Sequence, residues 1–150
     1  MPHEMRWLVD KRVVLTTFHG NITAEELTQF VTEIKAYIAD GTPLVHHISN
    51  SLDLQKVEFS LGTISSVAKA ASIIGQLGWQ VDVNINPINR MFANLGSQFA
   101  NIRTRTFATQ QEAIDFLKEN DTTLAELVWK IETPEKSEMI QNTPEVTKNV

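Results

Sequence analysis

Strand-like and helix-like hydrophobic patterns alternate from the start of the chain. Residues 5–10 alternate in polarity and residues 12–19 are rich in β-branched and aromatic side chains, which is typical of two strands joined as an antiparallel hairpin. Thr23 and Glu26 then have the spacing of a capping box, and apolar residues follow at helical intervals. Gly41 has the position expected of a glycine that ends this helix.

The middle of the chain contains shorter patterns of the same two kinds. The apolar run at 44–48 predicts a strand buried on both faces, and residues 49–53 indicate a polar loop. Apolar residues keep helical spacing over 60–77 and again over 87–99, which predicts two helices. Between these helices, residues 79–85 alternate between apolar and polar side chains and so predict a half-buried strand.

The last patterns predict one more strand and two helices. Residues 101–108 favour a strand, and a second capping box at 109–112 opens a helix. Apolar residues keep helical spacing from 124 to 131, which predicts a short terminal helix with Asp121 as its cap. The polar, proline-containing residues 133–150 are expected to be disordered.

The elements follow one another in the order β-β-α-β-α-β-α-β-α, before the terminal helix. A hairpin followed by alternating strands and helices predicts an α/β fold with a mixed, mainly parallel sheet covered by helices. We expect residues 1–132 to form a single domain, because a chain of 150 residues with 42% hydrophobic residues has enough apolar side chains for one sizeable core.

Composition excludes several classes of protein. The formal net charge of −5 argues against nucleic-acid binding. The absence of cysteine excludes disulfides, thiolate metal sites and cysteine nucleophiles. We recognise no secretory signal and no apolar stretch near the roughly 18 residues of a membrane span. We therefore expect a cytoplasmic protein that does not cross a membrane.

The motifs that would indicate a catalytic centre are missing. The sequence has neither a serine nucleophile elbow nor a glycine-rich phosphate loop. His46 and His47 are adjacent in a predicted strand, so their side chains point to opposite faces and one metal ion cannot easily bind both. His3 lies in a terminus that we expect to be frayed. We expect no metal and no cofactor, and a small hydrolase or isomerase that uses His46 or His47 is the least favoured alternative.

Ser60 and two arginines have more than one interpretation. Ser60 stands at the predicted start of the helix at 60–77, where a hydroxyl can cap the helix and where a phosphate would also be favoured by the free amides and the helix dipole. Arg103 and Arg105 share one face of the predicted last strand and are able to meet an anion. The interpretation that we favour for the arginines is an exposed sheet edge, where positive charge opposes aggregation.

Two stretches carry a resemblance to a known family. FHGNITAEEL at 18–27 and TFATQQEAIDFL at 106–117, together with the order of elements, resemble the SpoIIAA-like group of bacterial proteins, which is similar to STAS and anti-anti-sigma-factor domains and is also described as STAS/Sec14-like. The resemblance covers about residues 5–120 and implies that fold.

The resemblance also implies a regulatory site. In anti-anti-sigma factors, a serine at the start of the second helix is phosphorylated by a partner kinase, and this breaks partner binding. Ser60 is the corresponding candidate, although the family has Asp-Ser-Ser-Gly where this chain has Ser60-Leu61-Gly62.

The resemblance and the lack of a catalytic motif predict a non-enzymatic regulatory or ligand-binding domain that acts through protein–protein contacts. The candidates for its ligand or partner surface are His46, His47, Asn50, Asp53 and Arg90.

Two alternatives concern other partners. A lipid or another apolar small molecule is the alternative ligand, because residues 91–99 offer a broad apolar face. A homodimer is the second alternative, since Trp7, Trp79 and Trp129 can pack either between two copies or within one core.

Overall fold

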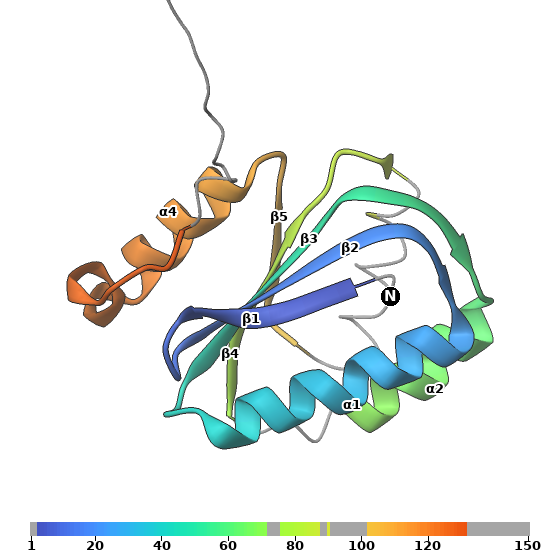
Figure 1. Cartoon of the computed structure of the whole chain (residues 1–150), viewed down its shortest axis with the longest axis horizontal. Coiled ribbons are helices and arrows are strands. Elements are labelled where there is room, and N and C mark those ends of the chain that lie inside the picture. Colours follow the sequence, from blue (N-terminus) through green and yellow to red (C-terminus); the bar gives the residue numbers. More distant parts are fainter. Residues whose placement is uncertain (1–2, 72–75, 88–89, 91–101, 132–150) are drawn as a thin grey trace, which may run out of the picture.

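The computed structural model describes residues 3–71, 76–87, 90 and 102–131, which build one five-stranded sheet with helices on both faces (Figure 1). The strands lie in the order β1-β2-β3-β4-β5, with β1 antiparallel to β2 and every other neighbouring pair parallel. In chain order the elements are β1 (His3–Val9), β2 (Val13–Thr23), α1 (Ala24–Asp40), β3 (Val45–Glu58), α2 (Leu61–Ala71), β4 (Leu77–Val83), β5 (Thr104–Phe107), α4 (Gln110–Asn120) and the 3₁₀ helix η1 (Thr122–Glu126). The predicted mixed, mainly parallel sheet is confirmed.

Parts of the sequence-based prediction lie outside the described residues. These are 72–75, most of the helix predicted at 87–99 and the tail at 133–150. None of the described helices is both long and apolar enough to cross a membrane.

The predicted hairpin and both capping boxes are present. Arg12 N donates to Val9 O at 2.9 Å and closes the turn between β1 and β2, with Lys11 in the left-handed region at a φ of 64°. At the start of α1, the backbone and side chain of Thr23 exchange hydrogen bonds with those of Glu26, and the residues at 109 and 112 repeat this arrangement at α4. Local spacing was sufficient here, because each cap involves residues only three positions apart.

Gly41 ends α1 as predicted, but for a different reason. Its φ of −89° is open to any residue, so the left-handed conformation typical of such glycines is not used. A Cβ at this position would lie 2.5 Å from Val45 Cγ2 and 2.8 Å from the Lys11 carbonyl oxygen. Glycine is therefore required by the close approach of β3 and the β1–β2 turn.

The polar loop predicted at 49–53 is wrong, because β3 continues through it to Glu58. Beyond Asn50, which is opposite Val83 at the end of β4, β3 keeps pairing with β2 as far as the pair Thr23 and Glu58. A strand needs backbone partners and not apolar side chains, so a long β2 is enough to hold a polar segment extended.

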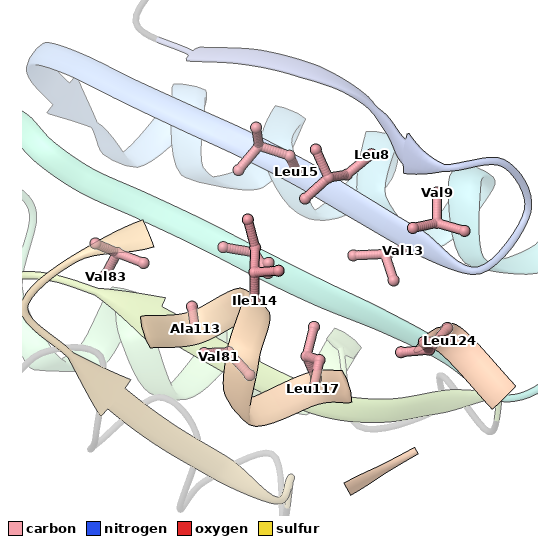
Figure 2. Close-up of a cluster of buried hydrophobic side chains, with 11 residues drawn as sticks. Leu8, Val9, Val13, Leu15, Val81, Val83, Ala113, Ile114, Leu117 and Leu124 are labelled. Carbon is pink, nitrogen blue, oxygen red and sulfur yellow. The ribbon is translucent and has the colours of Figure 1, made fainter. Parts of the chain in front are cut away.

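Two apolar cores cover the two faces of the sheet. Figure 1 shows α1 and α2 on one face and α4 on the other. On the α4 face, Ile114 and Leu117 point toward strand residues such as Leu15 (Figure 2). The buried members of this core are Leu8, Val9, Val13, Leu15, Ile48, Val81, Val83, Ala113, Ile114, Leu117 and Leu124. On the α1 face the buried cluster consists of Val14, Ile34, Ile38 and Val45.

The three tryptophans pack against these cores. Trp79 and Trp129 lie against the core beneath α4, and Trp7 lies against the core beneath α1. Each indole therefore has apolar neighbours within its own chain.

The terminal helix predicted after Asp121 is wrong beyond Glu126. Only the 3₁₀ helix η1 forms, and Val128 is 77% exposed in the extended segment that follows. In this segment Lys130 N donates to the Leu8 carbonyl at 2.7 Å. The segment is extended because the outer edge of β1 supplies a backbone partner, which helical spacing cannot reveal.

Candidate functional site

The sheet face beneath α1 carries a band of polar side chains that are buried. Asp82 and Asn84 are 6% and 3% exposed, so the half-buried strand predicted at 79–85 is wrong in leaving its polar residues in solvent. Central strands of a mainly parallel sheet are covered on both faces, so side chains on both faces become buried whatever their polarity. The buried polar residues of β2, β3 and β4 are Thr16, His46, His47, Ser49 and Asp82, and Asn84 directly follows β4; His46 alone belongs to the opposite face.

A continuous chain of hydrogen bonds joins five side chains in this band. His47 Nε2 is 2.8 Å from Thr16 Oγ1, and His47 Nδ1 is 2.6 Å from Gln80 Oε1. Gln80 Nε2 donates to Asp82 Oδ1 at 3.0 Å, and Thr104 Oγ1 donates to Asp82 Oδ2 at 3.3 Å. The chain of hydrogen bonds therefore crosses the sheet from β2 through β3 and β4 to β5.

The amide of Gln80 sets the direction of these bonds. Its oxygen can only accept, so His47 Nδ1 must hold the ring proton and donate it. His47 Nε2 is then an acceptor for the Thr16 hydroxyl. The Asp82 carboxylate accepts from both of its neighbours, so every donor has an acceptor when His47 is neutral and Asp82 is ionised.

Burial moves the pKa of both titratable groups toward their neutral forms. It lowers the pKa of His47 to about 4, opposed by the hydrogen bond with Gln80. It raises the pKa of Asp82 to about 6, although hydrogen bonds from Gln80 and Thr104 stabilise the carboxylate. At neutral pH, His47 is therefore uncharged and Asp82 is ionised, as the hydrogen bonds require. His47 is only 1% exposed, so a substrate in solution does not reach its ring in this conformation.

His46 points to the opposite face, which confirms the predicted divergence of the two histidines. Its Nδ1 accepts from Trp79 N and its Nε2 donates to Asp121 Oδ2, each at 3.0 Å. Arg12 Nη2 is 2.7 Å from the same carboxylate oxygen. His46 is 3% exposed and so acts as an internal link between β3, β4 and the start of η1.

The pKa values of the two titratable partners of this link, His46 and Asp121, depend on their surroundings in different ways. Burial lowers the pKa of His46, although the hydrogen bond and the charge of Asp121 oppose that shift. Burial would raise the pKa of Asp121, but hydrogen bonds from Thr123 and His46 and the charge of Arg12 lower it to about 2. Within the described ranges, no three His, Asp or Glu side chains are grouped as metal ligands.

His3 is also buried, so the expectation of a frayed terminus at this residue is wrong. It is 3% exposed, and its Nε2 is 2.9 Å from Glu33 Oε1. Its ring packs against Phe18 and Phe30. The reason is that β1 pairs with β2 from its first residue, with His3 opposite Phe18.

The carboxyl edge, at which β2, β3, β4 and β5 end, contains two further predicted residues. The half-buried Asn50 donates from Nδ2 to Gln110 Oε1 at 2.9 Å and so joins β3 to the start of α4. Arg90 Nε donates to the Asn84 carbonyl at 2.7 Å and so holds the segment that leaves β4. Both side chains have internal partners at this edge.

Exposed side chains lie beside them at the same edge. Asp53 is exposed on β3, opposite His19 of β2. Leu52 on β3 is 41% exposed, and Ile85, directly after β4, is 65% exposed. The carboxyl edge of a parallel sheet is the usual place for binding sites in open α/β folds.

Ser60 is exposed at the start of α2, directly after β3, which extends past the end of β4 as far as Glu58. Its Oγ accepts a hydrogen bond from Thr63 N at 3.2 Å. The predicted helix-capping role of Ser60 is confirmed. The hydroxyl is at the same time accessible from solvent.

Arg103 and Arg105 are exposed beside β5, the last strand in the sheet order. The Arg103 guanidinium lies 4.9 Å from the centre of the Trp79 ring, and that of Arg105 lies 5.5 Å from the centre of the Phe116 ring. Both arginines therefore lie at an exposed sheet edge, as predicted, and their role there stays a prediction.

Comparison with solved structures identifies the fold. No protein-family model and no curated protein matches this sequence. An uncharacterised DUF3478-family protein with a SpoIIAA-like fold from Shewanella loihica PV-4 matches with a TM-score of 0.55 and 15% identity, covering 77% of this chain and 91% of that chain. The anti-sigma factor antagonist SpoIIAA in its unphosphorylated form matches with a TM-score of 0.54 and 20% identity, covering 77% and 97%.

A third structure agrees with these two. The Bacillus cell fate determinant SpoIIAA in its phosphorylated form matches with a TM-score of 0.50 and 20% identity, covering 77% of this chain and 98% of that chain. In this chain the matched fold consists of a mainly parallel five-stranded sheet with helices on both of its faces. The chain therefore has a SpoIIAA-like, STAS-type α/β fold.

Proposed function

We propose that this chain is a non-enzymatic regulatory domain that binds a protein partner through the carboxyl edge of its sheet, and that a negative charge added at Ser60 weakens this binding. The observation that carries the proposal is the exposed Ser60 hydroxyl at the first turn of α2. The solved neighbours include an anti-sigma factor antagonist in unphosphorylated and phosphorylated forms. We expect the binding to take place in the cytoplasm.

The chemistry of this edge suits a partner that is a protein. Leu52 and Ile85 are exposed apolar side chains, and Asp53 supplies an exposed charge beside them. Exposed apolar residues with a polar surround are typical of protein interfaces. Asn50 and Arg90 support this surface from beneath, because they bind Gln110 and the Asn84 carbonyl.

Phosphorylation would act at the end of the same strand, β3, that carries Leu52 and Asp53. A kinase would transfer the terminal phosphoryl group of ATP to Ser60 Oγ, which would lose its proton. The product has a charge of about −1.5 to −2 at the positive end of a helix. It would disturb the bond from Thr63 N and oppose apolar or acidic partner residues at the carboxyl edge.

The test combines cross-linking with binding measurements. A photoactivatable amino acid at position 52 or 85 should yield an adduct with one protein in cells, whereas the same amino acid at position 128, on the exposed terminal segment, should not. Affinity for that purified protein should then fall at least tenfold in Ser60→Asp and stay unchanged in the control Ser66→Asp, an exposed serine of the same helix. Equal adducts at all three positions would contradict the proposed surface, and equal affinities of both aspartate variants would contradict the role of Ser60.

A further inference from the structure

Two arginines, one on β5 and one directly before it, have no carboxylate partner within the described part of the fold. Arg103 and Arg105 have no ion pair with any described residue, whereas Arg12 binds Asp121 and Lys11 binds Asp40. The formal net charge of the chain is −5. These two exposed side chains therefore form a positively charged patch on a chain whose net charge is negative.

The two guanidinium groups are held in position by aromatic rings that are themselves fixed. Trp79 and Phe116, on which they lie, meet edge to face with ring centres 5.0 Å apart. Phe107 packs against Phe116 from the end of β5 at 5.3 Å. An arginine that stacks on such a ring is already oriented, so it loses less freedom when it binds a carboxylate.

The backbone next to these arginines is available on one side. Gln80 N donates to the Arg103 carbonyl at 2.9 Å, and β4 continues to pair with β5 as far as Phe107. No further strand follows β5 in the sheet that the structure describes. The outward backbone groups of β5 are therefore able to pair with an added strand.

We propose that the edge of β5 binds an extended acidic segment of another protein as an added β-strand, with two carboxylates of that segment, two residues apart, meeting Arg103 and Arg105. Side chains of a strand return to the same face every second residue. Acidic residues at this period therefore place both charges opposite the two arginines, while the backbone of the segment pairs with β5.

Charge decides between the candidate occupants of this edge. A second copy of the chain that paired through β5 would bring its own Arg103 and Arg105 toward the same two residues, and like charges opposite each other destabilise a pair of strands. A basic segment is disfavoured for the same reason. This inference is independent of the proposed role of Ser60, which lies directly after β3.

The test uses the full chain and synthetic peptides. Fluorescence anisotropy should show that a labelled Val-Glu-Val-Glu-Val peptide binds, more weakly as salt increases, while Val-Lys-Val-Lys-Val does not bind. The double substitution Arg103→Gln and Arg105→Gln should weaken binding at least tenfold. Lys118→Gln is the matched control, because Lys118 also lies over an aromatic ring, that of Trp129, but stands on α4; it should leave binding unchanged.

Two further measurements separate strand addition from simple attraction between charges. Methylation of alternate peptide nitrogens removes backbone donors without changing charge, so it should abolish binding. The double substitution Arg103→Glu and Arg105→Glu should transfer binding to the lysine peptide. Absence of binding by the glutamate peptide, or equal binding by the Gln variant, would overturn the proposal. Retained binding by the methylated peptide would show an electrostatic contact without an added strand and would overturn it as well.

Discussion

His46 Nε2 donates to Asp121 Oδ2 at 3.0 Å across 75 residues of sequence. The same imidazole accepts from Trp79 N through Nδ1, so one ring holds the amino end of β3 to β4 and to the residue that begins η1. Arg12 completes the link from the β1–β2 turn. The junction between α4 and η1 is thus fastened to the sheet by side chains from two distant segments, those of His46 and Arg12.

The close packing around His46 predicts a large effect of a small substitution. A Cβ at Gly78 would lie 2.6 Å from two atoms of the His46 ring, so Gly78→Ala should lower the free energy of unfolding by roughly 1–3 kcal/mol. Urea unfolding followed by tryptophan fluorescence measures this change. Gly62→Ala is the matched control, since Ser60 Oγ at 3.6 Å is its nearest contact; at this exposed position of α2 it should stabilise by up to about 1 kcal/mol. Equal effects of the two variants would contradict the packing described.

The lowered pKa of Asp121 predicts that the protein loses stability in acid. Its pKa is lowered from 3.8 to about 2, so its contribution to stability is complete above about pH 4 and is lost as the pH falls toward 2. Asp121→Asn should cost roughly 1 kcal/mol at pH 7, after allowance for solvent screening at this partly exposed carboxylate. The difference from the unmodified chain should disappear at the acid end of that range. The control Asp115→Asn, exposed on α4 and bonded to Gln111, should change stability little at any pH.

For Asp82 we predict the opposite pH dependence of the free energy of unfolding. Burial raises its pKa from 3.8 to about 6, so the ionised carboxylate costs about 3 kcal/mol of stability at pH 7, and this cost is removed as the pH falls from 6 to 4. Asp82→Asn should therefore raise the free energy of unfolding at pH 7.5 by roughly 1–3 kcal/mol, with a smaller gain at pH 4.5. Denaturant titrations at both values measure it, with exposed Asp53→Asn as the control. A loss of stability at pH 7.5 would mean that the bonds from Gln80 and Thr104 outweigh the cost of burial.

The capping boxes predict a contrast within one helix. Thr23→Ala removes the acceptor for Glu26 N at the start of α1, and should destabilise the protein by about 1 kcal/mol. Thr32→Ala in the same helix removes only an exposed hydroxyl bonded to the Thr28 carbonyl, and should be neutral or slightly stabilising because alanine has the higher helix propensity. Thermal unfolding of both variants would show whether the cap or the loss of threonine itself matters.

Features that depend on neighbouring residues were predictable from the sequence. The hairpin, the caps at Thr23 and Thr109 and the opposite directions of His46 and His47 each follow from spacings of a few residues, because local geometry alone enforces them. The wrong predictions share a different cause. The extended segment at 49–53, buried His3 and the non-helical chain after Glu126 all depend on a backbone or side-chain partner that is distant in sequence.

The candidate sites divide in the same way. Ser60 was recognisable, because a serine that follows a strand and opens a helix can be read from neighbouring residues. Gln80, Asp82 and Thr104 were missed as members of one network, because their polarity indicated solvent. These residues could have been recognised from their place on strands of a mainly parallel sheet, because both faces of such a sheet are covered and its polar side chains are then buried.

By itself, the sequence determined most of the strands and helices and the mixed, mainly parallel character of the sheet, since periodicity, caps and alternation act over short distances. Only the tertiary structure decided that Asp82 and His47 share a buried hydrogen-bond chain and that Asp121 closes on His46. It also decided that Arg103 and Arg105 stand on aromatic rings at the free side of β5. The physical reason is that solvation and charge pairing depend on what the completed sheet brings near each side chain, which no local pattern records.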